Sequence, residues 1–378
     1  MLPGLRLRAL FFVAFASLSV ASAEAAVWHV GPDGDDANSG TGPAEAFGTL
    51  AHAVAQLAPG DTLVLQEGVY RETLEVTVPG TAADPITIRA AGTDAEPEAV
   101  TISGFDEVVP GSAGAGPWTV HAGAIWKIQL GAQAGTALGR NLVKVDGTVL
   151  FPARWPDIER LPGFDRRAMA EAGSGSVDTA SMGSLDGALA GIVPAYGWTD
   201  LYTGGYEDEA LSGFAAGSWK GAHIDLCAGH NWWAKTGVVT GNSADNLAFQ
   251  YRFADDWNPV LDTPKEGDRY ALWGHLQALD SPGEFFFDVH GLNGPAKTLY
   301  VWLPDGGSPE GRQVELLERE RSMNFGSHRH IHIRDFTVEG GAVESQPGSG
   351  DLVLDGVTVR FGAVNRNGLD YGSGRAVW

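Results

Sequence analysis

Carboxylates near the C-terminal end of the chain are the side chains whose types and spacing could do chemistry. Two carboxyl groups can cleave a glycosidic bond when they lie about 5–5.5 Å apart for retention or 6.5–9.5 Å apart for inversion. Equivalent residues on stacked strands lie about 4.8 Å apart, so neighbouring strands can build such a pair. We take Asp355 and Asp370 as catalytic candidates, and Asp335, 20 residues earlier, could adjoin Asp355. The alternative is that a corner Asp bonds its own turn backbone.

Asp370 lies in a polar, glycine-rich segment together with Asn367 and Tyr371. Carboxylates, amides and an aromatic face are groups that sugar sites combine, so Asn367 and Tyr371 are predicted to bind substrate. A solvated loop is the alternative. Arg154 and Trp155 could likewise stack on or bind a sugar, or they could anchor the middle part of the chain, if it forms an inserted sandwich, onto the β-helix formed by the rest.

Metal and cofactor sites are not indicated. His328, His330 and His332 alternate, which would set three imidazoles in a row on one strand face. Such a row spreads its ligands about 6–7 Å apart, whereas Zn²⁺ needs tetrahedral convergence. Cys227 is the one cysteine, so no intrachain disulfide can form, and it is predicted to be a small buried hydrophobe. We therefore predict no metal and no cofactor.

Charge and the N-terminus limit the partners and the compartment. The formal net charge of −22 argues against nucleic acid and, more weakly, against a polyanionic glycan. Arg6 and Arg8 precede a short apolar run, residues 10–20, and the small residues Ala21-Ser22-Ala23. This pattern is typical of a cleaved signal peptide over residues 1–23. The sequence predicts secretion, extracellular or periplasmic, with no membrane association after cleavage.

An internal repeat defines the end of the chain. Residues 331–338 align with residues 352–359 at an offset of 21, and apolar residues alternate within each copy. Asp335 and Gly356 interrupt the copies as sharp bends would. Two short strands per repeat at this period indicate a solenoid whose turns stack at the strand spacing.

The beginning of the chain has the same texture. Short strands are predicted at 62–65, 74–78, 86–88 and 100–102. Residues 49–58 have helical spacing with Thr49 as N-cap, and Pro59-Gly60 ends the helix. Such a helix would cap the first turn and cover its open strand edges.

The middle of the chain does not keep the repeat. Ten of the twelve tryptophans lie between Trp118 and Trp302, and alternating runs such as 298–302 are separated by turns such as Asn293-Gly294. This pattern favours an antiparallel β-sandwich inserted into the solenoid. The predicted division is 24–109 for the first part, 110–321 for the insertion and 322–378 for the resumed solenoid.

Several motifs resemble a known superfamily. Residues 28–41, 47–50, 59–62 and 68–72 resemble the start of secreted bacterial right-handed parallel β-helix proteins of the pectate-lyase-like superfamily. Residues 145–156 and 281–304 resemble glycoside hydrolases whose β-helix is interrupted by a β-sandwich, such as β-xylosidases. The resemblance implies an all-β fold, a right-handed parallel β-helix with a capping helix and an inserted antiparallel β-sandwich. It also implies a carbohydrate substrate, with catalytic carboxylates on turns after the insertion.

These observations lead to a functional expectation with two alternatives. We expect a glycoside hydrolase that acts on a plant or microbial glycan through paired carboxylates. A polysaccharide lyase is the first alternative, with arginines such as Arg360, Arg366 and Arg375 to neutralise a uronate. A non-catalytic glycan-binding or cell-surface protein is the second. Because only about two turns follow the insertion, we also expect further turns, with most catalytic groups, beyond Trp378.

Overall fold

The computed structural model describes residues 24–93, 95–131, 142–157, 168–183, 189, 201–229, 235–252 and 263–362. This part of the chain is nearly all β. Its helices are short: the α-helix α1 (Leu50–Val54) and the 3₁₀ helices η1 (Pro43–Glu45), η4 (Glu209–Gly213) and η5 (Leu276–Ala278). None of the helices in these ranges is long and apolar enough to cross a membrane.

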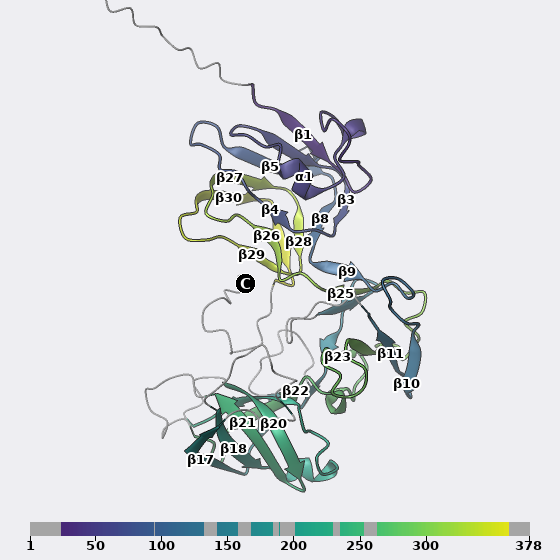
Figure 1. Ribbon diagram of the computed structural model, residues 1–378, viewed down its shortest axis with the longest axis vertical. Coiled ribbons are helices and arrows are strands. Elements are labelled where there is room, and N and C mark those ends of the chain that lie inside the picture. The colour runs from purple at the N-terminus through teal and green to yellow at the C-terminus, as the bar shows by residue number, and fades with distance from the viewer. Residues whose placement is uncertain are drawn as a thin grey trace, which may run out of the picture.

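Three parallel sheets form one end of the molecule, which we call the parallel body (Figure 1). The first sheet has the order β1 (Val27–Val30), β2 (Thr62–Leu65), β5 (Ile86–Ala90), β27 (Arg329–Arg334), β30 (Gly350–Asp355). The second has the order β3 (Gly68–Tyr70), β8 (Val100–Ser103), β28 (Thr337–Glu339), β31 (Thr358–Arg360). The third places β26 (Arg321–Asn324) between β4 (Leu74–Glu75) and β29 (Ala342–Glu344). A small hairpin pairs β6 (Gly92–Thr93) with β7 (Glu96–Pro97).

The chain visits the three sheets of the parallel body in a fixed cyclic order. One turn is β2, β3, β4, the next is β5, β8, β26, and the next is β27, β28, β29. Ile331 pairs in parallel with Leu352, and Ile333 with Leu354, which confirms the predicted alignment of the repeat. The predicted bends are also confirmed, because Asp335 and Gly356 both adopt φ of 64°.

Alternation along the strands builds the core of the parallel body. In β5 the buried residues Ile86, Ile88 and Ala90 alternate with half-exposed ones, because successive side chains of a strand point to opposite faces. Ile331 and Ile333 of β27 stack on Ile86 and Ile88 and are also fully buried. Each such side chain contributes roughly 1.5–3 kcal/mol by leaving water.

The capping helix is shorter than predicted. Thr49 is its N-cap, as expected, and its Oγ1 accepts a hydrogen bond from His52 N at 3.2 Å. The α-helix ends at Val54, and Leu57 is buried in the turn that follows it rather than in the helix. α1 contacts β1 and β4, so it covers one end of the interior that these strands enclose.

Between β8 and β26 the chain leaves the parallel body and forms sheets that are antiparallel apart from one short parallel pair, Phe151–Pro152 with Glu284–Phe285. The two nearer sheets, which we call the neck sandwich, share a core that includes Trp118, Ile128, Val143, Phe285 and Leu316. One sheet has the order β13 (Thr148–Val149), β12 (Val143–Val145), β25 (Val314–Leu317), β9 (Phe105–Glu107). The other has the order β10 (Thr119–Ala122), β11 (Ile125–Gln129), β24 (Thr298–Trp302), β23 (Glu284–Asp288), β14 (Phe151–Pro152).

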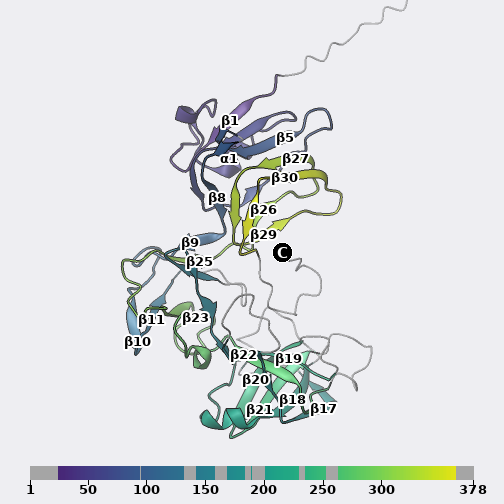
Figure 2. The same cartoon turned by 180° about the vertical axis from the view of Figure 1, so that it is seen from behind.

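A larger antiparallel sheet, the outer sheet, lies at the far end of the molecule (Figures 1 and 2). Its order is β15 (Arg154–Trp155), β22 (Arg269–Trp273), β19 (His223–Cys227), β20 (Lys235–Ser243), β21 (Asn246–Arg252), β18 (Leu201–Glu207), β17 (Ser174–Gly183), and β16 (Ala170–Glu171) also pairs with β22. Cys227 is buried against Met169 and Ala271, as its prediction as a small hydrophobe requires. The antiparallel strands begin at Phe105, before the expected residue 110, and comprise three sheets rather than one sandwich of two.

Candidate functional site

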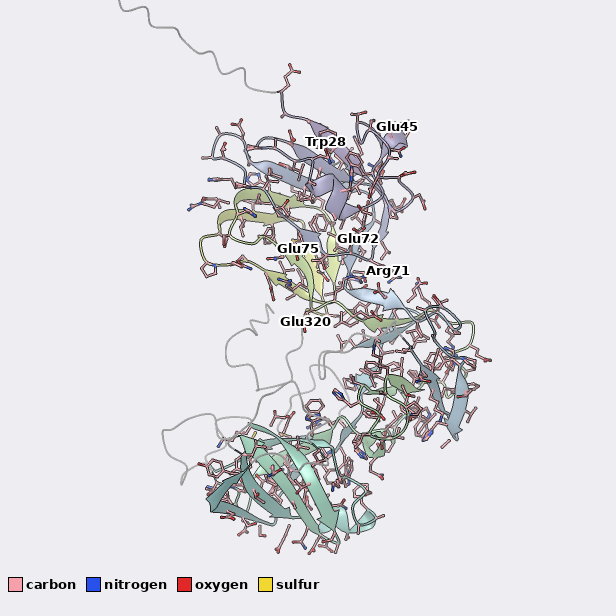
Figure 3. All side chains as sticks on the ribbon, in the orientation of Figure 1. Trp28, Glu45, Arg71, Glu72, Glu75 and Glu320 are labelled. Atoms are coloured by element: carbon pink, nitrogen blue, oxygen red, sulfur yellow. The ribbon has the colours of Figure 1, made fainter. Side chains whose placement is uncertain are left out.

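A row of polar side chains crosses the third sheet of the parallel body. Asn324 of β26 pairs with Glu75 of β4 on one side and with Glu344 of β29 on the other. Leu74 and Met323, which precede Glu75 and Asn324, are fully buried, so strand alternation turns the row outward. Figure 3 shows Glu75 on the half of the parallel body nearer to the inserted sheets.

Hydrogen bonds and ion pairs orient the members of this row. Asn324 Nδ2 donates to Glu75 Oε2 at 2.8 Å, and Asn324 Oδ1 accepts from Gly326 N at 2.9 Å. Arg321 lies 3.9 Å from Glu75 Oε1 and 3.8 Å from Glu344 Oε2. The side chains of Arg321, Glu75 and Glu344 are 44%, 44% and 41% exposed, so a solute can reach both carboxylates.

The spacing of the two carboxylates fits a bond-cleaving pair. Two strand spacings separate the Cα atoms of Glu75 and Glu344 by about 9.6 Å. Side-chain torsions can bring carboxyl groups on such backbones into the range of about 6.5–9.5 Å that inverting glycosidases use. Asn324 and Arg321 lie between them and offer hydrogen-bond donors for sugar hydroxyls.

A second acidic cluster, in the neck sandwich, is less suited to a soluble substrate. Glu284 is 4% exposed, and its Oε2 accepts from Asp280 N and Ser281 N at 3.3 and 3.2 Å. Burial, reinforced by Asp157, raises the pKa of Glu284 to about 8 and that of Asp280 to about 6. Because Glu284 is enclosed and holds the backbone of its own turn, we assign it a structural role.

The residues that the sequence suggested are placed as follows. Asp355 is exposed at the corner between β30 and β31, where its backbone oxygen accepts from Asp335 N at 3.0 Å. Asp335 and Asp355 are therefore neighbours, as predicted. Their corner lies between the first and second sheets, whereas the row of polar side chains lies on the third sheet. Asn367, Asp370 and Tyr371 lie outside the described residues.

Arg154 and Trp155 pack against the interior of the outer sheet. Arg154 is 4% exposed and donates from NH1 to Pro156 O at 2.8 Å and Ala168 O at 3.1 Å. Trp155 is half-buried, with its ring centroid 5.7 Å from Phe214 and 6.0 Å from Tyr270. These contacts lie within the inserted sheets, so they support a packing role there, which is neither sugar binding nor anchoring of the insertion on the parallel body.

The histidines at 328, 330 and 332 do not form one row. His330 adopts φ of 57°, which interrupts the alternation of the strand, and its Nδ1 lies 3.6 Å from Asp351 Oδ2. Among the described residues, no three His, Cys, Asp or Glu side chains gather as metal ligands would.

Glu75 was not singled out from the sequence. Its strand, 74–78, was predicted, but its partner β26 lies about 250 residues later in the chain, beyond the insertion. A signal was available: the predicted strand at 74–78 precedes the strand at 86–88 as residues 342–344 precede the repeat copy at 352–359, and this correspondence would have placed acids 75 and 344 on the same sheet.

Comparison with known proteins points to glycoside hydrolases as structural neighbours. No protein-family model matches the chain. Over 76 residues, 20% of the chain, it is 46% identical to the uncharacterized protein YwoF of Bacillus subtilis. Over 65 residues, 17% of the chain, it is 42% identical to alpha-1,3-galactosidase A of Akkermansia muciniphila.

The likeness to solved structures extends further along the chain. A solved glycoside hydrolase superposes with a TM-score of 0.57 at 18% identity, covering 84% of this chain and 51% of its own. The chain thus spans about half of that structure, and its matches span 15% of YwoF and 11% of the galactosidase. The shared feature is the all-β fold.

Proposed function

We propose that the chain belongs to a secreted glycoside hydrolase in which Glu75 and Glu344 are paired carboxylates. The row Glu75–Asn324–Glu344 is the observation that carries the proposal, because it sets two accessible acids on one sheet, two turns apart and on either side of Asn324. The likeness to a solved glycoside hydrolase and the partial match to a galactosidase support the same class.

The scaffold in this proposal is a right-handed parallel β-helix. Its support is the fixed cyclic order in which the chain visits three parallel sheets, with one strand added to each sheet per turn. The leader-like pattern in residues 1–23 supports secretion. The net charge of −22 favours a neutral glycan over a polyanionic one.

Substitution of the two acids tests the proposal. In the full-length protein, Glu75→Gln and Glu344→Gln should each lower the release of reducing ends from a responsive glycan by about 10²-fold or more, since general acid–base groups contribute 10²–10⁴-fold. Glu45→Gln is the control, because Glu45 is exposed at the other end of the parallel body (Figure 3) and should leave the rate within about twofold of wild type.

The same assay separates the alternatives. Absorbance from unsaturated uronates, appearing together with the new reducing ends, would identify a lyase, for which Arg321 between the two carboxylates is the favourable feature. Glycan binding without either product would identify a binding protein. Wild-type rates in both Gln variants would exclude Glu75 and Glu344 as the catalytic pair.

A further inference from the structure

The outer sheet carries a hollow that the carboxylate row does not use. It has a volume of about 750 Å³ and is lined by residues of β17, β18, β20 and β21. This volume lies in the usual range for small-molecule sites, about 300–1,000 Å³. Tyr206 and Leu247 are also among the residues that line the hollow, but their side chains are buried in the core with Phe249, so the hollow opens on the other face of the sheet.

Strand register explains how the hollow arises. Ser176 pairs with Gly205, Gly205 with Ala248, and Ala248 with Gly241, so short residues stand in line across four strands. Three strand spacings make this floor about 14 Å long. A Cβ added at Gly241 would meet no atom within 4 Å, which shows that the space above the floor is open.

Polar side chains stand on both sides of the floor. Residues two positions along a strand share its face, so the next pairs form two walls. Asp178 and Thr203, which pair across β17 and β18, form one wall. Glu207 and Asn246, which pair across β18 and β21, form the other wall. Ser174 Oγ donates a hydrogen bond to Glu207 Oε2 at 2.8 Å.

The chemistry of the lining selects the ligand. Hydroxyl, amide and carboxylate groups face the hollow, and carboxylates accept strong hydrogen bonds from hydroxyl groups. Neither lysine nor arginine is among the residues that line it, and two carboxylates would repel a polyanion. Protein interfaces use large aromatic and apolar side chains at their centres, whereas here Tyr206 and Leu247 turn theirs into the core and the floor consists of short residues. We propose that the hollow is a binding site for a neutral oligosaccharide, separate from the Glu75–Glu344 pair.

A side chain placed on the floor tests the proposal. In the full-length protein Gly241→Phe fills open space and should weaken binding of neutral oligosaccharides, measured by titration calorimetry over a panel, by at least tenfold. Gly213→Phe is the matched control, because Gly213 is exposed in η4 and also has nothing within 4 Å of an added Cβ. It should bind as wild type does, and oligouronates should bind to neither.

Further variants keep the test independent of folding and of the proposed catalysis. If circular dichroism shows that Gly241→Phe does not fold, Glu207→Gln combined with Asn246→Ala should give the same loss of binding. Glu75→Gln should bind in the hollow as wild type does, and Gly241→Phe should cleave a short soluble substrate at the wild-type rate. Failure of cleavage with intact binding would then count against the proposed function alone.

Three results would overturn the binding site. The first is an unchanged affinity in Gly241→Phe, and the second is the absence of binding by any neutral oligosaccharide in the panel. The third is self-association of the wild-type protein, detected by light scattering, that Gly241→Phe abolishes, since a second copy of the chain would then be the occupant.

Discussion

At the residue scale, His223 combines deep burial with unused hydrogen-bonding groups. It is 1% exposed, and within the described part of the chain neither Nδ1 nor Nε2 has a hydrogen-bond partner. Its ring stacks on Trp273 with centroids 4.5 Å apart, and the charged forms of His275 and His290 would face it. Burial therefore lowers the pKa of His223 from 6.5 to about 4, and the neighbouring histidines act in the same direction.

This depressed pKa predicts a pH-dependent stability. Between pH 6.5 and 4 the unfolded chain binds a proton that folded His223 does not, so the folded state loses stability as pH falls through this window. Between pH 7.5 and pH 5 the loss from this group is about 2 kcal/mol, at about 1.4 kcal/mol per pH unit. His223→Phe keeps the stacking and should gain this amount over wild type in urea unfolding.

The comparison isolates His223 from other titrating groups. Buried acids such as Glu284, whose pKa is raised, favour folding at low pH and oppose the trend in the total, but they cancel between variant and wild type. His52→Gln, in α1, is the control for the loss of a histidine outside the outer sheet. A constant difference between His223→Phe and wild type from pH 7.5 to pH 5 would contradict the prediction.

The sequence predicted acids as the chemistry of the site but not which acids. Glu344 lies between the two repeat copies, whereas Glu75 acquires a role only through pairing across the insertion. Arg154 and Trp155 have the composition of a sugar site, yet both pack inside the outer sheet. Burial depends on which surfaces meet in three dimensions, and residue type does not reveal it.

At the element scale, an ion-pair network fastens the neck sandwich to the parallel body. Lys144 of β12 lies 3.0 Å from Glu315 of β25 and 2.8 Å from Glu339 of β28. Arg71, after β3, lies 2.8 Å from Glu315 and 2.9 Å from Glu107 of β9. Lys144 and Glu315 are 5% and 6% exposed, so water screens their attraction only slightly.

Removal of one partner should therefore be costly. Lys144→Met should lower the free energy of unfolding by about 3 kcal/mol, because it leaves Glu315 and Glu339 buried with less compensating charge. Adding Glu315→Gln and Glu339→Gln should recover part of the loss. Arg312→Met removes a solvent-screened pair with Asp305 and should change the free energy of unfolding far less than Lys144→Met does, as denaturant titration can check. Equal losses in Lys144→Met and Arg312→Met would show that the network does not fasten the two parts.

Elements that depend on local pattern were predicted well, and those that depend on distant pairing were not. The repeat predicted that residues 331–333 stack in parallel on residues 352–354, and Thr49 was predicted as the N-cap of α1. The sequence did not distinguish the outer sheet from the neck sandwich, because the alternation of apolar and polar residues identifies a strand but does not show which strand it pairs with. Strands β15 and β22, whose Arg154 and Trp273 pair, are more than 100 residues apart in the chain.

At the scale of the whole molecule, the cores are separate and the junction is narrow. The core of the parallel body draws its buried residues from 30–102 and 323–338, and that of the neck sandwich from 108–316. Phe105, Leu142 and Leu317 form a small cluster at the junction. β9 and β25 are antiparallel neighbours there, so the chain leaves and returns side by side.

This geometry predicts that the parallel body folds without the insertion. Val108 N donates to Val314 O at 2.8 Å, so a two-residue Asn-Gly turn can replace residues 109–313 in the full-length protein. The shortened protein should unfold cooperatively and keep slow hydrogen exchange at Ile331 and Ile333, because the core around them loses no member. The same excision with Ile333→Asp is the control and should not fold, since it buries an unpaired charge. The opposite outcome would be no cooperative transition and rapid hydrogen exchange at both isoleucines. The parallel body would then depend on the inserted sheets, through Lys144 and the junction cluster, although it has a core of its own.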